Sequence, residues 1–219
     1  MPNNNYKLKS ELLRNKIFED ENILVLNKPA NLAVQGGSKV NISVDQLFDY
    51  RLTHRIDKDT SGILILAKNQ KIAANLIEKF KYKKIWKTYL AIIIGRPKKL
   101  RGKISTPIYN EHKGKQAALT EYEIIDYVGN ELSFAALYPI TGRKHQIRIH
   151  LKDLNCPILG DGKYGGKNAF KNNLHNKIHL HAYKLEIDNY LGKKKIFTAE
   201  MPDKFRESMN LLGFNEALL

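Results

Sequence analysis

Two neighbouring stretches of alternating side chains constrain the fold of this chain most strongly. Residues 118–124 and residues 132–138 each carry apolar side chains at every second position. Side chains of a β-strand point to opposite faces in turn, so a period of two is typical of a strand with one buried face. The gap between the two stretches, residues 126–130 with Gly129, has the length of a hairpin loop. The pattern therefore predicts an antiparallel hairpin within a sheet.

The other segments mix strands and helices in an irregular order. Branched and aromatic residues predict further strands over residues 23–26, 32–35, 87–95, 180–187 and 195–199. Apolar residues at helical spacing predict helices over residues 44–51, 70–81 and 143–154, and a short helix from Asp203. Strands outnumber helices and do not alternate with them regularly. This order favours an α+β fold with a mixed, mainly antiparallel central sheet and flanking helices.

Spacing also assigns faces to two of the predicted helices. Asn69 has the side chain of an N-cap for the helix over 70–81. The apolar face of that helix consists of Ile72, Leu76, Ile77 and Phe80. In the helix over 143–154, the apolar face holds Ile147, Leu151 and Leu154, and a polar face holds His145, Arg148 and Lys152. We expect the first residues, up to about Arg14, to form a weakly ordered arm or a short helix, and Gly36-Gly37-Ser38 to form a turn.

The charge of the chain points to a polyanionic partner. Lys and Arg number 37 against 22 Asp and Glu, which gives a formal net charge of +15. A surface of this charge attracts nucleic acid first, although a basic protein from a Lys- and Asn-rich proteome is an alternative. Cys156 is the only cysteine, which fits a reducing cytoplasm. The polar N-terminus and the short apolar runs predict neither a secretion signal nor a membrane span.

Several familiar motifs are matched only in part. Residues 160–165 read G-x-G-x-x-G but lack the strand and helix of a dinucleotide-binding unit. Asp57 and Asp59 resemble a phosphatase aspartate pair, but the apolar strand follows the pair instead of preceding it. His175 and His179 have an i, i+4 spacing with no set of Cys or carboxylates to complete a zinc site. We therefore expect no metal and no dinucleotide.

Three segments place polar groups beside predicted secondary structure. Residues 54–62 contribute a carboxylate, residues 87–91 a tyrosine, and residues 141–150 arginines. A buried Asp needs a cationic partner, because removing one member of a buried pair costs about 3–5 kcal/mol. Arg148 and Arg143 are both candidates for that partner. An Asp held beside cations is suited to acid–base or covalent chemistry on an anionic substrate.

These segments resemble the RluA-type pseudouridine synthase family. His54-Arg55-Ile56-Asp57-Lys58-Asp59-Thr60-Ser61-Gly62 is similar to that family's H-R-L-D-x-x-T-S-G signature. Further blocks follow the family's order along almost the whole chain: residues 27–29, 87–91, 115–120, 141–150, 157–161 and 180–182. Residues 25–29 and 33–38 look most like the RluC branch, which acts on uridines of large-subunit ribosomal RNA.

The resemblance implies a fold, a reaction and site residues. The fold would be the pseudouridine synthase fold, with its sheet and helices around a catalytic cleft. Asp57 would be the nucleophile, attacking either the base or the ribose C1′. Tyr89 would stack on the uracil and act as a late base, and Arg148 would pair with Asp57. Arg55 would fill the gap that the flipped base leaves. The remaining residues expected at the RNA are His54, Lys28, Arg143, His145 and Gln146.

The resemblance also implies partners and boundaries. We expect 23S ribosomal RNA or a pre-ribosomal particle as substrate, no cofactor, no membrane, and a cytoplasmic monomer. Residues 1–15 would be an N-terminal arm and residues 16–219 the catalytic domain. Many relatives carry an S4 RNA-binding domain, for which the residues before Ile23 are too few. The alternatives are a non-catalytic RNA-binding or ribosome-assembly factor on the same fold, and a synthase directed to transfer RNA.

Three positions depart from the family pattern. Asn31 stands where a glycine is frequent, Lys144 where Thr or Ser is usual, and Gln35 where the RluC branch tends to have His. None of these departures removes a proposed catalytic group.

Overall fold

A computed structural model describes residues 2–37 and 40–218 of the chain. The chain forms two compact units. Unit 1 consists of Met1–Trp86 and Ala182–Glu200, and unit 2 consists of Lys87–His181 and Met201–Leu219. Neither unit is one continuous stretch of sequence, so each contains residues that lie far apart along the chain.

Unit 1 is built on antiparallel strands. They are β1 (Lys16–Glu19), β2 (Ile23–Lys28), β3 (Arg51–Leu52), β4 (Ser61–Ala67), most of β11 (Leu180–Tyr190), and β12 (Lys193–Thr198). The spatial order is β1-β2-β4-β11, while β3 pairs with β4 and β12 pairs with β11. All residues of β4 are buried, because its unbroken run of apolar side chains leaves no face for water.

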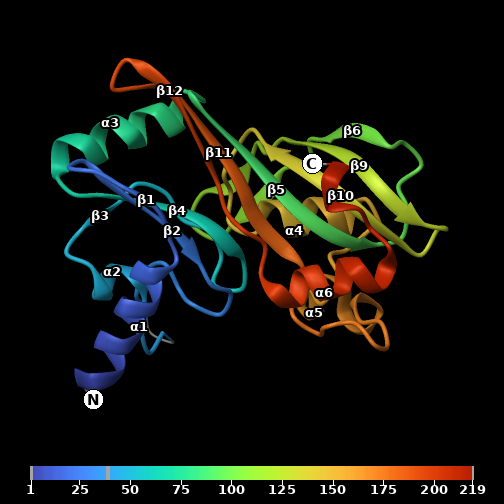
Figure 1. Cartoon of the computed structure of the whole chain (residues 1–219). Coiled ribbons are helices and arrows are strands. Elements are labelled where there is room, and N and C mark those ends of the chain that lie inside the picture. The colour runs from blue at the N-terminus through green and yellow to red at the C-terminus, as the bar shows by residue number, and fades with distance from the viewer. Residues whose placement is uncertain (1, 38–39, 219) are drawn as a thin grey trace. The chain divides into compact units, whose positions relative to one another are not determined.

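The predicted helix over 70–81 is confirmed as α3 (Gln70–Lys81), shown in teal in Figure 1. The Asn69 side chain caps it by accepting from the amide of Ile72 at 2.9 Å. Ala73 and Leu76 lie in the unit 1 core with residues of β2 and β4. Ile77 is 49 % exposed, so its assignment to the apolar face was wrong; Ala73 covers the sheet in its place.

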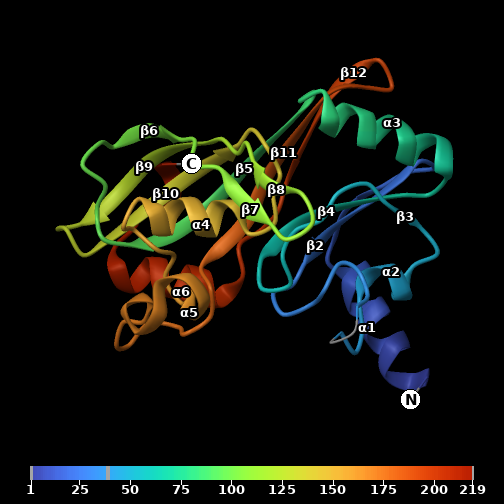
Figure 2. The same cartoon turned by 180° about the vertical axis from the view of Figure 1, so that it is seen from behind.

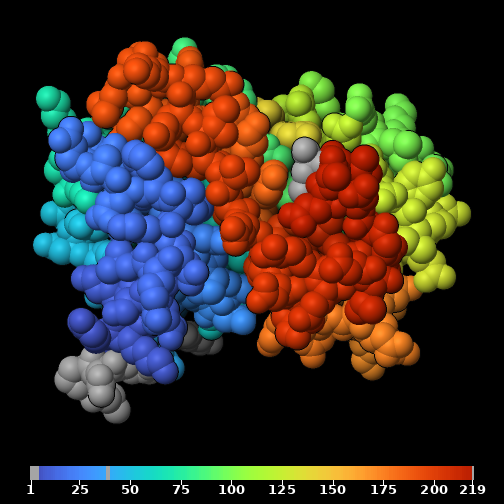
Figure 3. Space-filling model, viewed as in Figure 1, coloured from blue at the N-terminus to red at the C-terminus, as the bar shows by residue number. Residues whose placement is uncertain are grey.

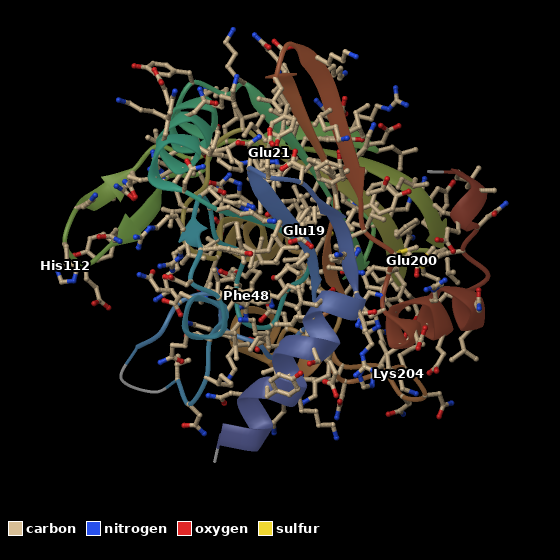
Figure 4. All side chains as sticks on the ribbon, turned by 60° about the vertical axis from the view of Figure 1, so that its left-hand side comes forward. Glu19, Glu21, Phe48, His112, Glu200 and Lys204 are labelled. Atoms are coloured by element: carbon tan, nitrogen blue, oxygen red, sulfur yellow. The ribbon has the colours of Figure 1, made fainter. Side chains whose placement is uncertain are left out.

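Two predictions for residues 32–51 were wrong. Residues 32–35 form no strand, because the carbonyl groups of Ala33 and Val34 accept from the first amides of α2 (Val44–Leu47). The helix predicted over 44–51 ends at Leu47, since Phe48 has an extended backbone. The apolar side chain of Phe48, labelled in Figure 4, is buried, and the Nζ of Lys9 on α1 (Pro2–Arg14) lies 5.2 Å from the centre of its ring. Of the two alternatives predicted for the first residues, a weakly ordered arm or a short helix, the structure has the helix α1. Ser38 of the predicted turn lies outside the described residues.

Unit 2 contains the predicted hairpin. Its strands are β9 (Thr120–Val128) and β10 (Leu132–Pro139), with one bulge in their antiparallel register between Phe134 and Ala135. The strand order is β5-β10-β9-β6, where β5 is Ile85–Ile94 and β6 is Arg101–Ile104. A separate hairpin pairs β7 (Ile108–Asn110) with β8 (Gly114–Gln116).

Helices cover both faces of β10. Ala135 and Leu137 pack in one cluster with Ile147 and Leu151 of α4 (Gln146–Asp153). Phe134 points to the opposite face and contacts Phe205 of α6 (Asp203–Leu212) at a ring distance of 6.5 Å. Accordingly, α6 lies in front of the sheet in Figure 1 and α4 in front in Figure 2. Short helical turns complete the unit: α5 (Gly162–Gly165), Gly166–Ala169 and Glu216–Leu218.

The predicted α+β class with a mainly antiparallel sheet is confirmed. Across the part of the chain that the structure describes, we find no helix with the length and apolar character of a membrane span.

Gly62 at the start of β4 generates a first prediction. Its φ of +109° is unfavourable for other residues, and an added Cβ would lie 2.3 Å from the carbonyl oxygen of Ala182. We expect Gly62→Ala to lower the free energy of unfolding by about 3 kcal/mol or more, because strain and overlap add. Gly142→Ala is the matched control, since nothing lies within 4 Å of its added Cβ. Denaturant titrations that give equal losses for the two variants would contradict this prediction.

Candidate active site

The segment that carries Asp57 is an irregular loop closed by a tight turn. Residues 53–60 connect β3 to β4 without regular structure. The amide of Thr60 donates to the carbonyl of Asp57 at 3.1 Å, which closes a four-residue turn. Thr60 is buried directly before β4, whereas Asp57 is half-buried. The turn thus places the Asp57 carboxyl group at the rigid end of a buried strand.

Lys28 holds this loop from inside unit 1. It is the last residue of β2, and its side chain is fully buried. Its Nζ donates to the carbonyl oxygens of Pro29 at 2.7 Å, Leu32 at 2.8 Å and Lys58 at 3.2 Å. An ammonium group has three donors, so all three are used on backbone oxygens. The side chain therefore joins the 29–32 turn to the loop that carries Asp57.

The carboxyl groups of the loop act on the charge of Lys28. Burial lowers the pKa of Lys28 to about 7, and the negative charges of Asp59 and Asp57 oppose that shift. The expectation that Lys28 contacts RNA was wrong, because a fully buried ammonium group cannot reach a phosphate.

The departures at Asn31 and Gln35 have local explanations. Asn31 has a φ of 67°, the left-handed region that glycine and asparagine adopt most readily, so it replaces the glycine of the family pattern without loss of the turn. The Gln35 side-chain oxygen accepts from the exposed Arg55 guanidinium at 3.3 Å. Arg55 therefore lies at the surface, where its predicted role at the RNA is sterically possible.

His54 is anchored by its ring. Its Nε2 accepts from the amide of Ile65 at 3.0 Å, which assigns the proton to Nδ1. The ring also packs on Phe80 with a centroid distance of 4.7 Å. These contacts fix His54 between the loop and α3, and its contact with RNA stays a prediction.

In unit 2, Arg148 is held by a carboxylate. Its Nε and one terminal amino group donate to the two oxygens of Asp161, each at 2.8 Å. Both side chains are buried, and the guanidinium carbon lies 5.1 Å from the ring centre of Tyr164. Arg148 therefore has a polar partner, as the predicted polar face requires, but the residue points into the protein, and the bidentate partner compensates its charge.

The residues around the start of α4 have different environments. Gln146 is buried, and its amide group bonds to Thr141, Arg143, Leu119 and Thr120. The expectation that Gln146 contacts RNA was wrong, since every donor and acceptor of its amide has a protein partner. His145 is half-buried, has a left-handed φ of 55°, and makes a 2.8 Å bond between Nδ1 and the Tyr164 hydroxyl. Arg143 is exposed and donates from Nε to a carbonyl oxygen at 3.1 Å.

Tyr89 lies on β5, where it pairs with Leu137 of β10 and is half-buried. The predicted pairing of Arg148 with Asp57 would join residues of different units, and it stays a prediction. A guanidinium has five N–H donors, of which Asp161 takes two, so the Asp161 pair does not exclude a second carboxylate.

Sequence reasoning missed Asp161 and Tyr164 as partners of Arg148. Asp161 lies in the glycine-containing segment that was weighed for dinucleotide binding, and it is the only acidic residue of the 157–161 block. Within residues 2–37 and 40–218, no group of three or more His, Cys, Asp or Glu side chains is arranged to hold a metal ion.

Known proteins resemble this chain in sequence. Residues 22–153 match the family described as RNA pseudouridylate synthase. Ribosomal large subunit pseudouridine synthase C of Rickettsia bellii is 40% identical over 210 residues, covering 86% of this chain and 69% of that protein. Ribosomal large subunit pseudouridine synthase D of Borreliella burgdorferi is 37% identical over 218 residues, covering 86% of this chain and 65% of that protein.

The fold is similar to that of solved structures. Human RNA Pseudouridylate Synthase Domain Containing 4 superimposes with a TM-score of 0.86 at 25% identity, covering 97% of this chain and 98% of that one. Human RNA Pseudouridylate Synthase Domain Containing 1 gives a TM-score of 0.71 at 24% identity, covering 85% of this chain and 83% of that one.

The Lys28 contacts predict a stability loss. We expect Lys28→Met to lower the free energy of unfolding by about 1–3 kcal/mol, because buried carbonyl oxygens lose their donor. Lys58→Met is the control, since Lys58 contributes its backbone carbonyl and has an exposed side chain. It should change stability by less than about 0.5 kcal/mol. Equal losses in urea titrations would show that the Lys28 ammonium group holds nothing in place.

The difference in stability between the wild-type protein and Lys28→Met should depend on pH. The pKa of Lys28 is about 7 in the folded protein and near 10.5 in the unfolded chain. Between pH 7 and pH 10.5 the unfolded chain therefore binds more protons than the folded protein. Wild-type stability therefore rises with pH in this window, and the loss in Lys28→Met should grow from pH 7 to pH 9.

The buried pair in unit 2 predicts a second loss. We expect Asp161→Asn to lower the free energy of unfolding by about 3 kcal/mol, because the Arg148 charge stays buried without its carboxylate. Glu131→Gln, which breaks an exposed 3.2 Å pair with Lys171, should cost less than about 1 kcal/mol. If Asp161→Asn is as stable as the Glu131 variant, the charge of Arg148 is compensated elsewhere.

Proposed function

Because this chain belongs to the RNA pseudouridylate synthase family, we propose that it isomerises specific uridines of large-subunit ribosomal RNA to pseudouridine. The single observation that carries the proposal beyond family membership is the Asp57 turn, which the buried Lys28 cation holds in place. A carboxylate used as a nucleophile must be held in a fixed position, and the bond of Lys28 to the backbone of Lys58 supports this requirement.

The reaction conserves all atoms of the nucleotide. The bond between N1 of uracil and ribose C1′ breaks, the uracil rotates, and a bond forms between C5 and C1′. The proton on C5 leaves and N1 gains one, so no redox or phosphoryl cofactor is consumed. We propose Asp57 as the nucleophile, with attack at the base or at C1′ as the two routes.

Further roles follow the family resemblance. We propose that Tyr89 stacks on the uracil and takes up the C5 proton, and that Arg148 stabilises the Asp57 carboxylate. The fixed position of the Arg148 guanidinium on Asp161 supports a role that needs a rigid cation. We propose that Arg55 occupies the space of the flipped base, since extrusion of a base costs a few kcal/mol that a cation in its place offsets in part. The exposure of Arg55 supports this role.

The substrate and setting are part of the same proposal. The relatives named above act on the ribosomal large subunit according to their names, and the net charge of +15 suits a ribosomal RNA substrate. We propose that the protein works as a monomer in the cytoplasm, on 23S ribosomal RNA or a pre-ribosomal particle.

Asp57→Asn tests the proposal. We expect the rate of pseudouridine formation to fall by about 10⁴-fold or more, because an amide is a poor nucleophile. Release of tritium from [5-³H]uridine-labelled ribosomal RNA measures the rate, since the C5 hydrogen leaves in the reaction. RNA affinity of the variant should stay within a few-fold of wild type.

Asp59→Asn is the matched control for that experiment. It makes the same change of charge two residues away in the same turn, and its activity should stay far above that of Asp57→Asn, because Asp59 acts on Lys28 and not on the uridine. Undiminished tritium release by Asp57→Asn would refute the proposed nucleophile. If the wild-type protein binds RNA but releases no tritium from it, the non-catalytic alternative is favoured.

A further inference from the structure

A group of lysines gathers at one end of unit 1. We name it the lysine patch; its members are Lys79, Lys81, Lys83, Lys84, Lys184, Lys193, Lys194 and Lys195. The first four lie at and after the end of α3, and the others lie on the β11–β12 hairpin. Two hydrogen bonds join these segments: Lys79 Nζ donates to the carbonyl of Asp188 at 3.3 Å, and the amide of Asp188 donates to the carbonyl of Lys84 at 3.1 Å. Figures 1 and 2 show α3 beside the hairpin in both views.

Positive charge is in excess in the lysine patch. Within the same segments, residues 78–84 and 184–195, the acidic residues are Glu78, Glu186 and Asp188. Glu186 is shared between Lys184 at 3.1 Å and Lys194 at 2.7 Å. Eight lysines therefore face three carboxylates, and the surplus attracts an anionic polymer. In Figure 3 the hairpin, in orange-red, lies at the surface above the blue N-terminal strands of the same unit.

Two aromatic side chains are exposed in the segment that carries Lys81, Lys83 and Lys84. Tyr82 is 59 % exposed and Trp86 is 50 % exposed. Ile85 lies in the unit 1 core, so the next side chain along the strand, Trp86, points to the opposite face. Exposed indole and phenol rings between lysines offer stacking surfaces next to phosphate-binding groups, the combination by which proteins bind single-stranded nucleic acid.

The lysine patch is separate from the Asp57 loop. An added Cβ on Gly62, at the end of that loop, would touch Ala182 on β11. All lysines of the patch except Lys184 lie at the end of α3, which meets the same strand at Asp188, or on β12. Six residues of a strand span about 20 Å. An RNA fragment that fills only the surroundings of Asp57 therefore does not cover the patch.

We propose that the lysine patch is a second RNA-binding surface, on which a segment remote from the target uridine places its phosphates on the lysines and a base or ribose against Trp86. The inference rests on the proposed function for the identity of the RNA. An acidic protein would satisfy the charges, but the two exposed aromatic rings among the lysines favour RNA.

The single tryptophan of the chain makes the patch directly observable. Acrylamide quenching of Trp86 fluorescence is measured with and without in vitro transcribed large-subunit ribosomal RNA, with the full-length protein. We expect the RNA to lower the quenching constant at least twofold at low salt. A seven-nucleotide RNA with one uridine should leave it unchanged, because it is too short to cover both surfaces.

Charge variants identify the surface that binds. The patch variant carries Lys81→Gln, Lys83→Gln and Lys193→Gln, and the control variant carries Lys7→Gln, Lys71→Gln and Lys167→Gln, all at exposed positions. Both lose three charges, so non-specific attraction falls equally. We expect the patch variant to bind the long RNA about tenfold more weakly than the control and with a shallower dependence on salt.

The outcomes separate this inference from the proposed function. Unprotected Trp86 in the RNA complex, or equal affinities of the two triple variants, overturns the lysine patch as an RNA surface and leaves the Asp57 experiment unaffected. If poly-glutamate protects Trp86 from acrylamide quenching and RNA does not, the patch binds an acidic protein and the inference is overturned. Protection of Trp86 by RNA supports it even if Asp57→Asn stays active.

Discussion

The buried ammonium group of Lys28 is the interaction on which the geometry of the Asp57 loop depends. It donates to carbonyl oxygens of the 29–32 turn and of Lys58, so one side chain sets the separation of two loops. Burying the charge is unfavourable, as the lowered pKa of Lys28 shows, and the carboxylates of Asp57 and Asp59 offset part of that cost. The two carboxylates thus favour the charged form of Lys28, which opposes the larger effect of burial.

Unit 2 follows the same physical principle with a different cation. Arg148 is buried on α4, and the two oxygens of Asp161 receive its N–H groups in parallel. A planar guanidinium held at two points has little freedom to turn, whereas a lysine held by three carbonyl groups fixes the backbone instead. Both arrangements fix polar groups before substrate arrives, so less ordering is left to the moment of reaction.

Local patterns in the sequence predicted most of the fold. The β9–β10 hairpin and α3 follow from periodicity and from the Asn69 cap, which depend on neighbours in sequence. The prediction of a strand over 32–35 was wrong because carbonyl groups of this segment accept hydrogen bonds from the first amides of α2. The spacing of apolar residues in the sequence does not reveal such a contact. The candidate residues were found by their motif, but the burial of Lys28 and the identity of Asp161 as the partner of Arg148 were not predicted, because charged residues are rarely buried without specific partners. Those partners, backbone oxygens for one and Asp161 for the other, arise from tertiary structure.

Titration of the Lys28 side chain tests most directly whether its buried ammonium group holds the Asp57 loop. Nitrogen-15 NMR of the lysine side chains, compared between wild type and Lys28→Met, identifies the Nζ signal of Lys28. We expect this signal to titrate near pH 7, far below the usual 10.5, and its protons to exchange slowly with water. A signal that titrates near 10.5 with rapidly exchanging protons would show that Lys28 is solvated and does not hold the Asp57 loop.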